Sequence, residues 1–257
     1  MNRIQQLFKD KQKDILSVFF TAGFPQLQHT REIAISLHHA GADMIEIGIP
    51  FSDPIADGPV IQESNRVALE QGMTLRKLLE QVKELRSQVK MPVILMGYLN
   101  PVLQYGMEQF CADASKAGVD GLILPDMPME EYLSEYSNLF KAHNLLNIFM
   151  IAPTTSEERI RQIDDVSDGF VYAVSSSSTT GSRREFNQDQ LEYFKKLKKM
   201  HLQNPLLIGF GISNHETFVA ACGHSRGAIV GSAFITLLKE SRNLNADIRT
   251  FVKEIRG

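Results

Sequence analysis

The sequence predicts a single α/β domain over residues 1–257, folded as a TIM (β/α)8 barrel, from three observations. Eight short β-rich runs occur along the chain, they alternate with longer amphipathic segments, and no linker or low-complexity stretch divides them. Eight βα units in about 250 residues are typical of this barrel. A doubly wound open sheet is the alternative, but "TAGFPQ" after the first run lacks the glycine pattern of a dinucleotide-binding turn.

The predicted strands are mostly apolar at both odd and even positions, as expected for parallel strands that are covered on both faces. They lie at residues 15–21, 43–48, 92–98, 120–125, 145–151, 169–175, 205–210 and 227–232. The segments between them carry apolar residues three and four positions apart, as in Leu75, Leu78, Leu79 and Val82. This spacing predicts helices with one apolar face, which would form the outer layer of the barrel.

Composition favours a small-molecule substrate. The formal net charge is -3, with acidic and basic residues mixed along the chain, so neither nucleic acid nor an anionic membrane is expected as a partner. The N-terminal stretch is too polar for a signal peptide and no apolar run approaches the roughly 20 residues of a membrane span, which predicts a cytoplasmic protein. The two cysteines and seven histidines show no metal-ligand spacing, so no metal site is expected.

The stretch "EIGIPFSDPIADGP", residues 46–59, places a carboxylate at the end of a predicted strand and follows it with a proline-rich loop. Catalytic groups of such barrels lie at the C-terminal ends of strands and in the loops that follow. Side chains alternate along a strand, so Glu46 points into the barrel mouth while Ile45 and Ile47 face the helices. A structural salt bridge to a barrel lysine is the alternative for Glu46, although no strand interior offers that lysine.

The loop after Glu46 carries Asp53 and Asp57, and its prolines hold the backbone at low entropic cost. Such a loop suits a carboxylate that must be held still over a site. For Asp53, a helix cap or a turn is an equally good interpretation.

Glycine-rich segments follow the last three predicted strands: "TTGS", "GFGIS" and "GSAF". Backbone amides at helix N-termini bind phosphate, and glycine allows close approach. Three such segments at neighbouring strand ends favour a phosphate site, although a glycine after a strand is ordinarily a turn residue. Tyr98 and Tyr172 end the third and sixth strands, where each either fills the core or walls a site.

These residues resemble the α chain of tryptophan synthase. "EIGIPFSDPIADGPVIQ" is very close to that family's signature, and "MGYLNPV", "DGLILPDMP", "IAPTTSEERI", "GFGIS" and "GAIVGSA" extend the similarity over nearly the whole chain. The resemblance implies a carbon–carbon lyase that cleaves indole-3-glycerol phosphate to indole and glyceraldehyde 3-phosphate. It also implies an α2β2 complex in which a β chain holds pyridoxal phosphate and receives the indole, while the α chain itself carries no cofactor.

Carried over by position, the resemblance makes Glu46 and Asp57 the catalytic pair. It places Phe19, Tyr98, Ile123 and Tyr172 around the indole, Thr180 on the lid in contact with the aspartate, and Gly181, Gly211, Ile212, Gly231 and Ser232 around the phosphate. One departure lies in the lid, "VSSSSTTGSR", where Ser178 and Thr179 replace a usual glycine and aliphatic residue. This departure predicts intact chemistry with altered lid closure.

The implied chemistry gives the two carboxylates different roles. Glu46 would protonate indole C3 and then deprotonate the adjacent hydroxyl, while Asp57 would stabilise the positive charge on the ring. Other phosphate-binding barrels are the rival enzymes, but the epimerases need strand-end histidines and indole-glycerol-phosphate synthase needs strand-end lysines, which are absent here. A subunit that only regulates its β chain is the non-enzymatic rival, and indole release by the isolated chain distinguishes it.

Overall fold

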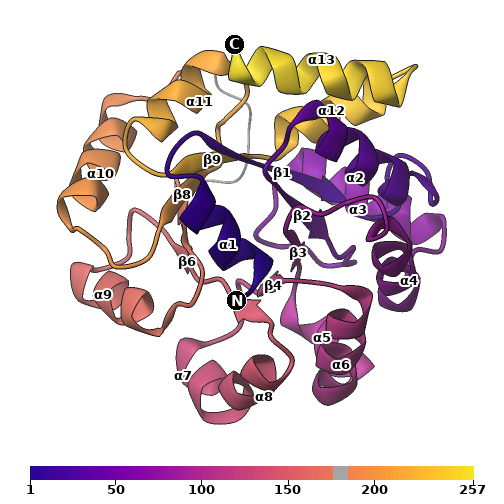
Figure 1. The fold of residues 1–257 in the computed structure, drawn as a ribbon, viewed down its shortest axis with the longest axis horizontal. Coiled ribbons are helices and arrows are strands. Elements are labelled where there is room, and N and C mark those ends of the chain that lie inside the picture. The colour runs from indigo at the N-terminus through magenta and orange to yellow at the C-terminus, as the bar shows by residue number, and fades with distance from the viewer. Residues whose placement is uncertain (176–184) are drawn as a thin grey trace.

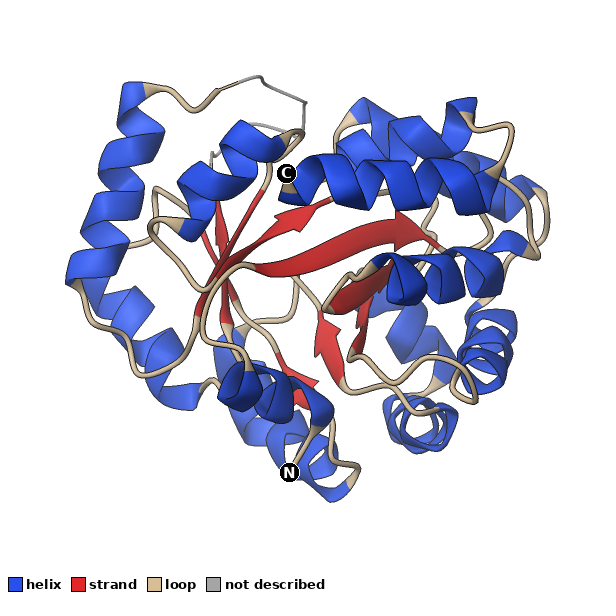
Figure 2. Ribbon diagram, turned by 45° about the horizontal axis from the view of Figure 1, so that its top comes forward, coloured by secondary structure: helices blue, strands red, loops and turns tan. Residues whose placement is uncertain are grey.

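The computed structural model describes residues 1–175 and 185–257 and has the predicted barrel as its core. The strands are β1 (Ile15–Thr21), β2 (Met44–Gly48), β3 (Val93–Met96), β4 (Gly121–Ile123), β5 (Leu146–Asn147), β6 (Met150–Ile151), β7 (Val171–Val174), β8 (Leu206–Gly209) and β9 (Gly227–Val230). They form one sheet in the order β5-β4-β3-β2-β1-β9-β8-β7-β6, and every pair is parallel. Figures 1 and 2 show this sheet curled inside a ring of helices.

Apart from the N-terminal helix, the helices lie around the outside of the ring (Figure 1). In chain order the helices are α1 (Arg3–Asp10), α2 (His29–Ala40), α3 (Pro59–Glu70), α4 (Leu75–Leu85), α5 (Leu99–Tyr105), α6 (Met107–Ala117), α7 (Met129–Glu131), the π-helical turn η1 (Tyr132–Tyr136), α8 (Ser137–Ala142), α9 (Glu157–Val166), α10 (Gln188–Lys199), α11 (His215–Cys222), α12 (Ser232–Glu240) and α13 (Leu244–Arg256). In the described part of the chain, no helix combines the length and the apolar composition that crossing a membrane requires.

The prediction of one continuous strand over residues 145–151 is wrong. The chain bonds to β4 through β5 and to β7 through β6, and between them Ile148 donates its amide to Leu122 while Phe149 accepts the amide of Tyr172. The first half of this segment is hydrogen-bonded only to β4 and the second half only to β7, so neither half pairs with strands on both of its sides. It nevertheless occupies the place of the fifth barrel strand and joins the two ends of the sheet.

Helix α1 was not predicted and closes the N-terminal end of the barrel. A capping box of Asn2 and Gln5 starts the helix, and its apolar side chains Ile4 and Phe8 are buried. The ring of Phe8 lies 5.7 Å from that of Phe170, which precedes β7. In Figure 1 the helix lies across the centre of the ring. With this end covered, the opposite end, where the strands terminate, is the open mouth.

The barrel has two apolar layers, as the alternation along the strands predicts. Met44, Ile94 and Ile229 belong to the cluster inside the ring, whereas Ile45 and Ile47 pack in the cluster between strands and helices. The prediction for the two faces of β2 is therefore confirmed, and the backbone of Glu46 directs its side chain to the interior. The fold thus brings a carboxylate into an apolar environment.

Candidate active site

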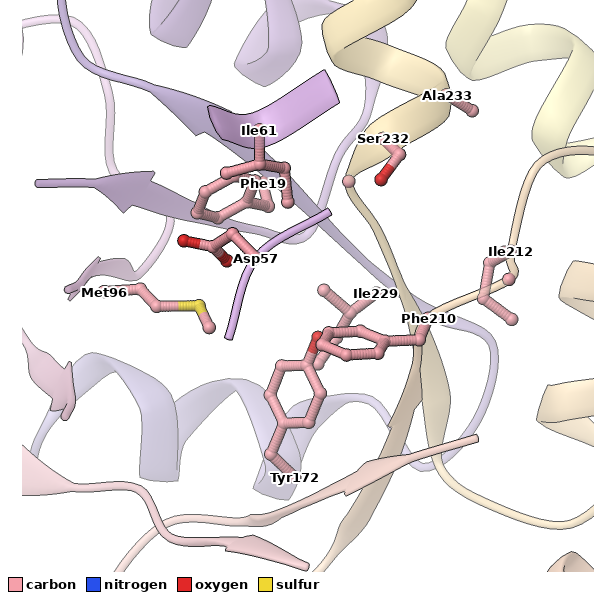
Figure 3. A pocket seen from close by; sticks show the side chains of 12 residues that line it. Phe19, Asp57, Ile61, Met96, Tyr172, Phe210, Ile212, Ile229, Ser232 and Ala233 are labelled. Atoms are coloured by element: carbon pink, nitrogen blue, oxygen red, sulfur yellow. The ribbon is translucent and has the colours of Figure 1, made fainter. Parts of the chain in front are cut away.

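Two adjoining cavities open at the mouth of the barrel, and five residues line both: Phe19, Asp57, Ile61, Met96 and Phe210. The first cavity is completed by Tyr172, Gly211, Ile212, Ile229, Gly231, Ser232 and Ala233. The second is completed by Gly48, Ile49, Ala56, Asn65, Tyr98, Pro125 and Met150. Figure 3 shows Asp57 entering the first cavity beside Phe19, with Phe210 and Tyr172 facing it. Together they form one elongated, mostly apolar site.

Asp57 lies where the two cavities meet, held by the loop after β2. Its amide donates to Pro54 O at 3.1 Å, and its carbonyl accepts from the Gln62 side chain at 2.8 Å. Tyr98 donates its hydroxyl to Asp57 Oδ2 at 3.2 Å and accepts the Ala56 amide at 3.0 Å. Burial raises the pKa of Asp57 to about 6, while the Tyr98 hydrogen bond opposes that shift. The carboxylate is therefore ionised at neutral pH and fixed in direction.

Glu46 lies in the barrel interior as predicted, but its carboxylate is not in the mouth. The residue is fully buried, and its Oε1 accepts a 2.7 Å hydrogen bond from Ser17 Oγ. Glu46 is not among the residues that line the two cavities, whereas its register partner Phe19 lines both. Burial raises the pKa of Glu46 to about 8, and the Ser17 hydrogen bond acts in the opposite direction. The group is mainly protonated at neutral pH and can act as a general acid.

Glycines at strand ends make room for the aromatic walls. A Cβ on Gly48 would lie 2.8 Å from the Phe19 ring, and a Cβ on Gly209 would collide with the Tyr172 hydroxyl. Tyr172 is buried, and its pKa is raised well above the ordinary value by burial and by the nearby carboxyl groups of Glu46 and Asp57. Its hydroxyl thus stays neutral and can donate a hydrogen bond.

The far end of the first cavity is built from backbone. Phe210 and Gly211 follow β8 with φ of 68° and 77°, in the left-handed region that a phenylalanine rarely adopts. Helix α12 begins after Gly231, which makes no side-chain cap. The first amides of such a helix point outward without intrahelical partners, although in α12 the Phe234 amide donates to Gly231 O at 2.9 Å. This combination suits an anion such as phosphate.

The structure brings most of the predicted site residues together. Phe19, Asp57, Tyr172, Gly211, Ile212, Gly231 and Ser232 line the first cavity, and Tyr98 lines the second. Ile123 is buried inside the barrel and lines neither cavity. Thr180 and Gly181 lie outside the described residues.

The sequence did not indicate eleven further lining residues: Gly48, Ile49, Ala56, Ile61, Asn65, Met96, Pro125, Met150, Phe210, Ile229 and Ala233. Met96 and Met150 sit on strands that had been predicted, so the position of each strand end could have identified them. Phe210 lies inside the "GFGIS" segment, whose glycines carry the phosphate-site pattern. In the described residues, no three His, Cys, Asp or Glu side chains are grouped so that they could hold a metal ion.

Comparison with known proteins gives the family. The family model described as "Tryptophan synthase alpha chain" matches residues 5–256. A protein of that name from Flavobacterium psychrophilum is 53% identical over 255 residues, which are 99% of this chain and 100% of the relative. Another, from Parabacteroides distasonis, is 54% identical over 239 residues, 93% of each chain.

Solved structures agree with the sequence relatives. The crystal structure of tryptophan synthase subunit alpha from Legionella pneumophila is 34% identical, with a TM-score of 0.89 over 100% of this chain and 97% of that one. The likeness thus extends over the whole barrel. The chain therefore belongs to the tryptophan synthase alpha chain family, the lyases that cleave indole-3-glycerol phosphate to indole and glyceraldehyde 3-phosphate.

Proposed function

We propose that Glu46 and Asp57 are the catalytic residues of this cleavage. Protonated Glu46 gives its proton to indole C3, and the Asp57 carboxylate stabilises the resulting positive charge through the ring N–H. The Glu46 carboxylate then takes the proton of the adjacent side-chain hydroxyl. As that carbonyl forms, the bond from C3 to the side chain breaks and its electron pair returns to the ring. Each proton that Glu46 gives is recovered, so no further reactant is needed.

The position of Asp57 between the two cavities is the observation that carries this proposal. The second cavity presents Tyr98, Met96 and Met150, which suit a planar aromatic ring. An indole bound among them would have its ring N–H near Asp57, which lines the same cavity. The first cavity ends at the Gly211 loop and the start of α12, which suit the phosphate. A substrate with an indole at one end and a phosphate at the other fits this division. Thr180 and Gly181 remain lid residues on resemblance alone.

The dependence of kcat/KM on pH tests the two roles together. The reaction needs Asp57 ionised and Glu46 protonated, so kcat/KM should rise through about pH 6 and fall through about pH 8. Tyr98→Phe removes the hydrogen bond that opposes the rise in the Asp57 pKa, so it should move the acid limb to higher pH. Because a substrate phosphate also titrates near pH 6, this movement is the decisive control. If the acid limb of kcat/KM lies at the same pH in Tyr98→Phe and in the wild type, the titrating group is the substrate phosphate and not Asp57.

The phosphate end is tested by Gly211→Val. A β-branched residue strains the left-handed backbone at this position, so KM for the phosphorylated substrate should rise at least about tenfold while indole still binds normally. The chain has no tryptophan, so ligand indole fluorescence can be read directly. Gly41→Val is the matched control, because Gly41 has a φ of 95°, has open space around it and ends α2 away from the site. If both variants lose phosphate affinity equally, loss of the fold rather than of the loop is responsible.

We also propose that the chain works in the cytoplasm as part of an α2β2 complex, with pyridoxal phosphate in the β chain and indole passed between the two sites. Exposed apolar side chains near the site support a partner surface: Ile55, in the Asp57 loop, is 87% exposed and Leu103, on α5, is 45% exposed. Titration of a matching β chain should raise kcat for indole release by about five- to 150-fold, the range of an ordinary coupling. Full activity of the isolated chain, or an Asp53→Ala variant with unchanged binding and activation, would reject coupling through this loop.

A further inference from the structure

Ser17 on β1 is the residue that determines where the Glu46 carboxyl group lies. Its Oγ donates to Glu46 Oε1 at 2.7 Å, and both residues are fully buried. In the sheet register Glu46 pairs with Phe19, whereas Ser17 pairs with Met44, two residues earlier on β2. Ser17 therefore lies two residues nearer the N-terminal end of β1 than Phe19, the register partner of Glu46. The hydrogen bond draws the carboxyl group toward Ser17, and Glu46 lines neither cavity.

The two carboxyl oxygens of Glu46 are in different situations. The hydroxyl of Ser17 has Oε1 as its acceptor, so this oxygen behaves as the carbonyl oxygen of a neutral carboxyl group. The proton then belongs on Oε2, which is buried and has no hydrogen-bond partner in the described part of the chain. A buried O–H without an acceptor is costly. One hydrogen bond thus holds the group in a position that leaves its other oxygen unsatisfied.

In the part of the chain that the structure describes, only burial and the Ser17 hydrogen bond shift the pKa of Glu46, and no cationic side chain contributes to that shift. On the two neighbouring strands, the register partners of Glu46 are Phe19 and Ile94. The titratable groups that interact with it from other elements are the Tyr172 hydroxyl on β7 and, through that hydroxyl, Asp57 in the loop after β2. Both belong to the cavity, on the mouth side. Among the described residues, the attraction that retains the carboxyl group in its buried position is therefore the hydrogen bond from Ser17.

We propose that Ser17 is a positioning residue that holds Glu46 in a retracted resting position, and that Glu46 must leave this hydrogen bond to reach the reacting carbon. The inference rests on the catalytic role of Glu46 given under Proposed function. The Ser17–Glu46 hydrogen bond must then break before each proton transfer to the substrate. Substrate binding drives this release, because the hydroxyl of the substrate side chain and the Tyr172 hydroxyl offer hydrogen-bond partners to Glu46 Oε2, which has none in the resting position.

The test is the steady-state cleavage of indole-3-glycerol phosphate by the full chain carrying Ser17→Ala. Without the hydroxyl, neither oxygen has a partner in the retracted position, so the mouth position becomes relatively more favourable. We expect kcat to rise about two- to tenfold, the range set by the net strength of one neutral hydrogen bond. Ser17→Thr keeps the hydroxyl and should keep the wild-type kcat. Ser167→Ala is the control, because Ser167 is also buried and donates its hydroxyl to Ile163 O at 2.6 Å, outside the site.

A kcat for Ser17→Ala that is unchanged or lower than that of the wild type would overturn the inference. Ser17 would then either stabilise Glu46 in the position used for proton transfer or have no effect on its position. If Ser17→Ala does not fold, infrared spectroscopy of the wild-type chain gives the answer. The carbonyl stretch of protonated Glu46, assigned by its loss in Glu46→Gln, should shift when a non-cleavable indole-3-alkyl phosphate binds. An unshifted band would show that Glu46 stays on Ser17.

The same variants separate this inference from the proposed function. Should Glu46→Gln remain active, the catalytic role of Glu46 is wrong. Should Glu46→Gln be inactive while Ser17→Ala behaves as the wild type, only the role of Ser17 is wrong.

Discussion

Replacing Glu46 with glutamine is expected to lower kcat by at least about a hundredfold, because the amide has the shape of the protonated carboxyl group but cannot transfer its proton. Substrate binding should change little, since Glu46 does not line the cavities in the resting position. The measurement is indole release at saturating substrate, together with the affinity for a non-cleavable analogue. Retention of a tenth of the wild-type kcat would exclude Glu46 as the proton-transfer group.

The same substitution should stabilise the protein at high pH. The pKa of Glu46 rises from 4.5 in the unfolded chain to about 8 in the folded one, so between these values the folded state holds a proton that the unfolded state releases. The free energy of unfolding therefore falls as the pH rises through this window, by a total of about 3 to 5 kcal/mol. Glu46→Gln removes this loss.

Denaturant unfolding at pH 5 and pH 9 checks the effect on stability. The variant and the wild type should be nearly equal at pH 5, and the variant should be the more stable protein at pH 9. Equal stability at both values would mean that Glu46 is not buried as a neutral group.

Asp57→Asn is expected to lower kcat by about a hundred- to a thousandfold, because the amide cannot offer the negative charge that the protonated ring requires. The variant should also lose the acid limb near pH 6, since the group that titrates there has been removed. Measurement of kcat and of kcat/KM across pH 5 to 9 checks both expectations.

Asp53→Asn is the matched control for Asp57→Asn. Asp53 belongs to the same loop, but its side chain is exposed and is not among the cavity-lining residues. In the isolated chain this variant should keep the wild-type kcat. A similar loss of activity in both variants would point to a disturbed loop and not to the charge of Asp57.

Much of the fold could be predicted because it depends on local pattern. The positions of seven of the eight strands follow from short apolar runs, and the two faces of β2 follow from strict alternation, which placed Ile45 and Ile47 outside and Glu46 inside. Alternation is a property of the extended chain itself, so it needs no knowledge of neighbouring strands. The sequence pattern does not predict helix α1, because its two buried apolar residues, Ile4 and Phe8, lie in an otherwise polar stretch.

The sequence by itself determined a barrel of βα units and a mouth that holds Asp57, Tyr98 and Tyr172, because the C-terminal ends of parallel strands meet at one edge. Only the tertiary structure decided which groups contact each other there. The Tyr98–Asp57 and Ser17–Glu46 hydrogen bonds join residues 41 and 29 positions apart, and each depends on the register between separate strands and loops. The pKa values of the two carboxyl groups follow from burial, which arises only when the whole ring closes around them.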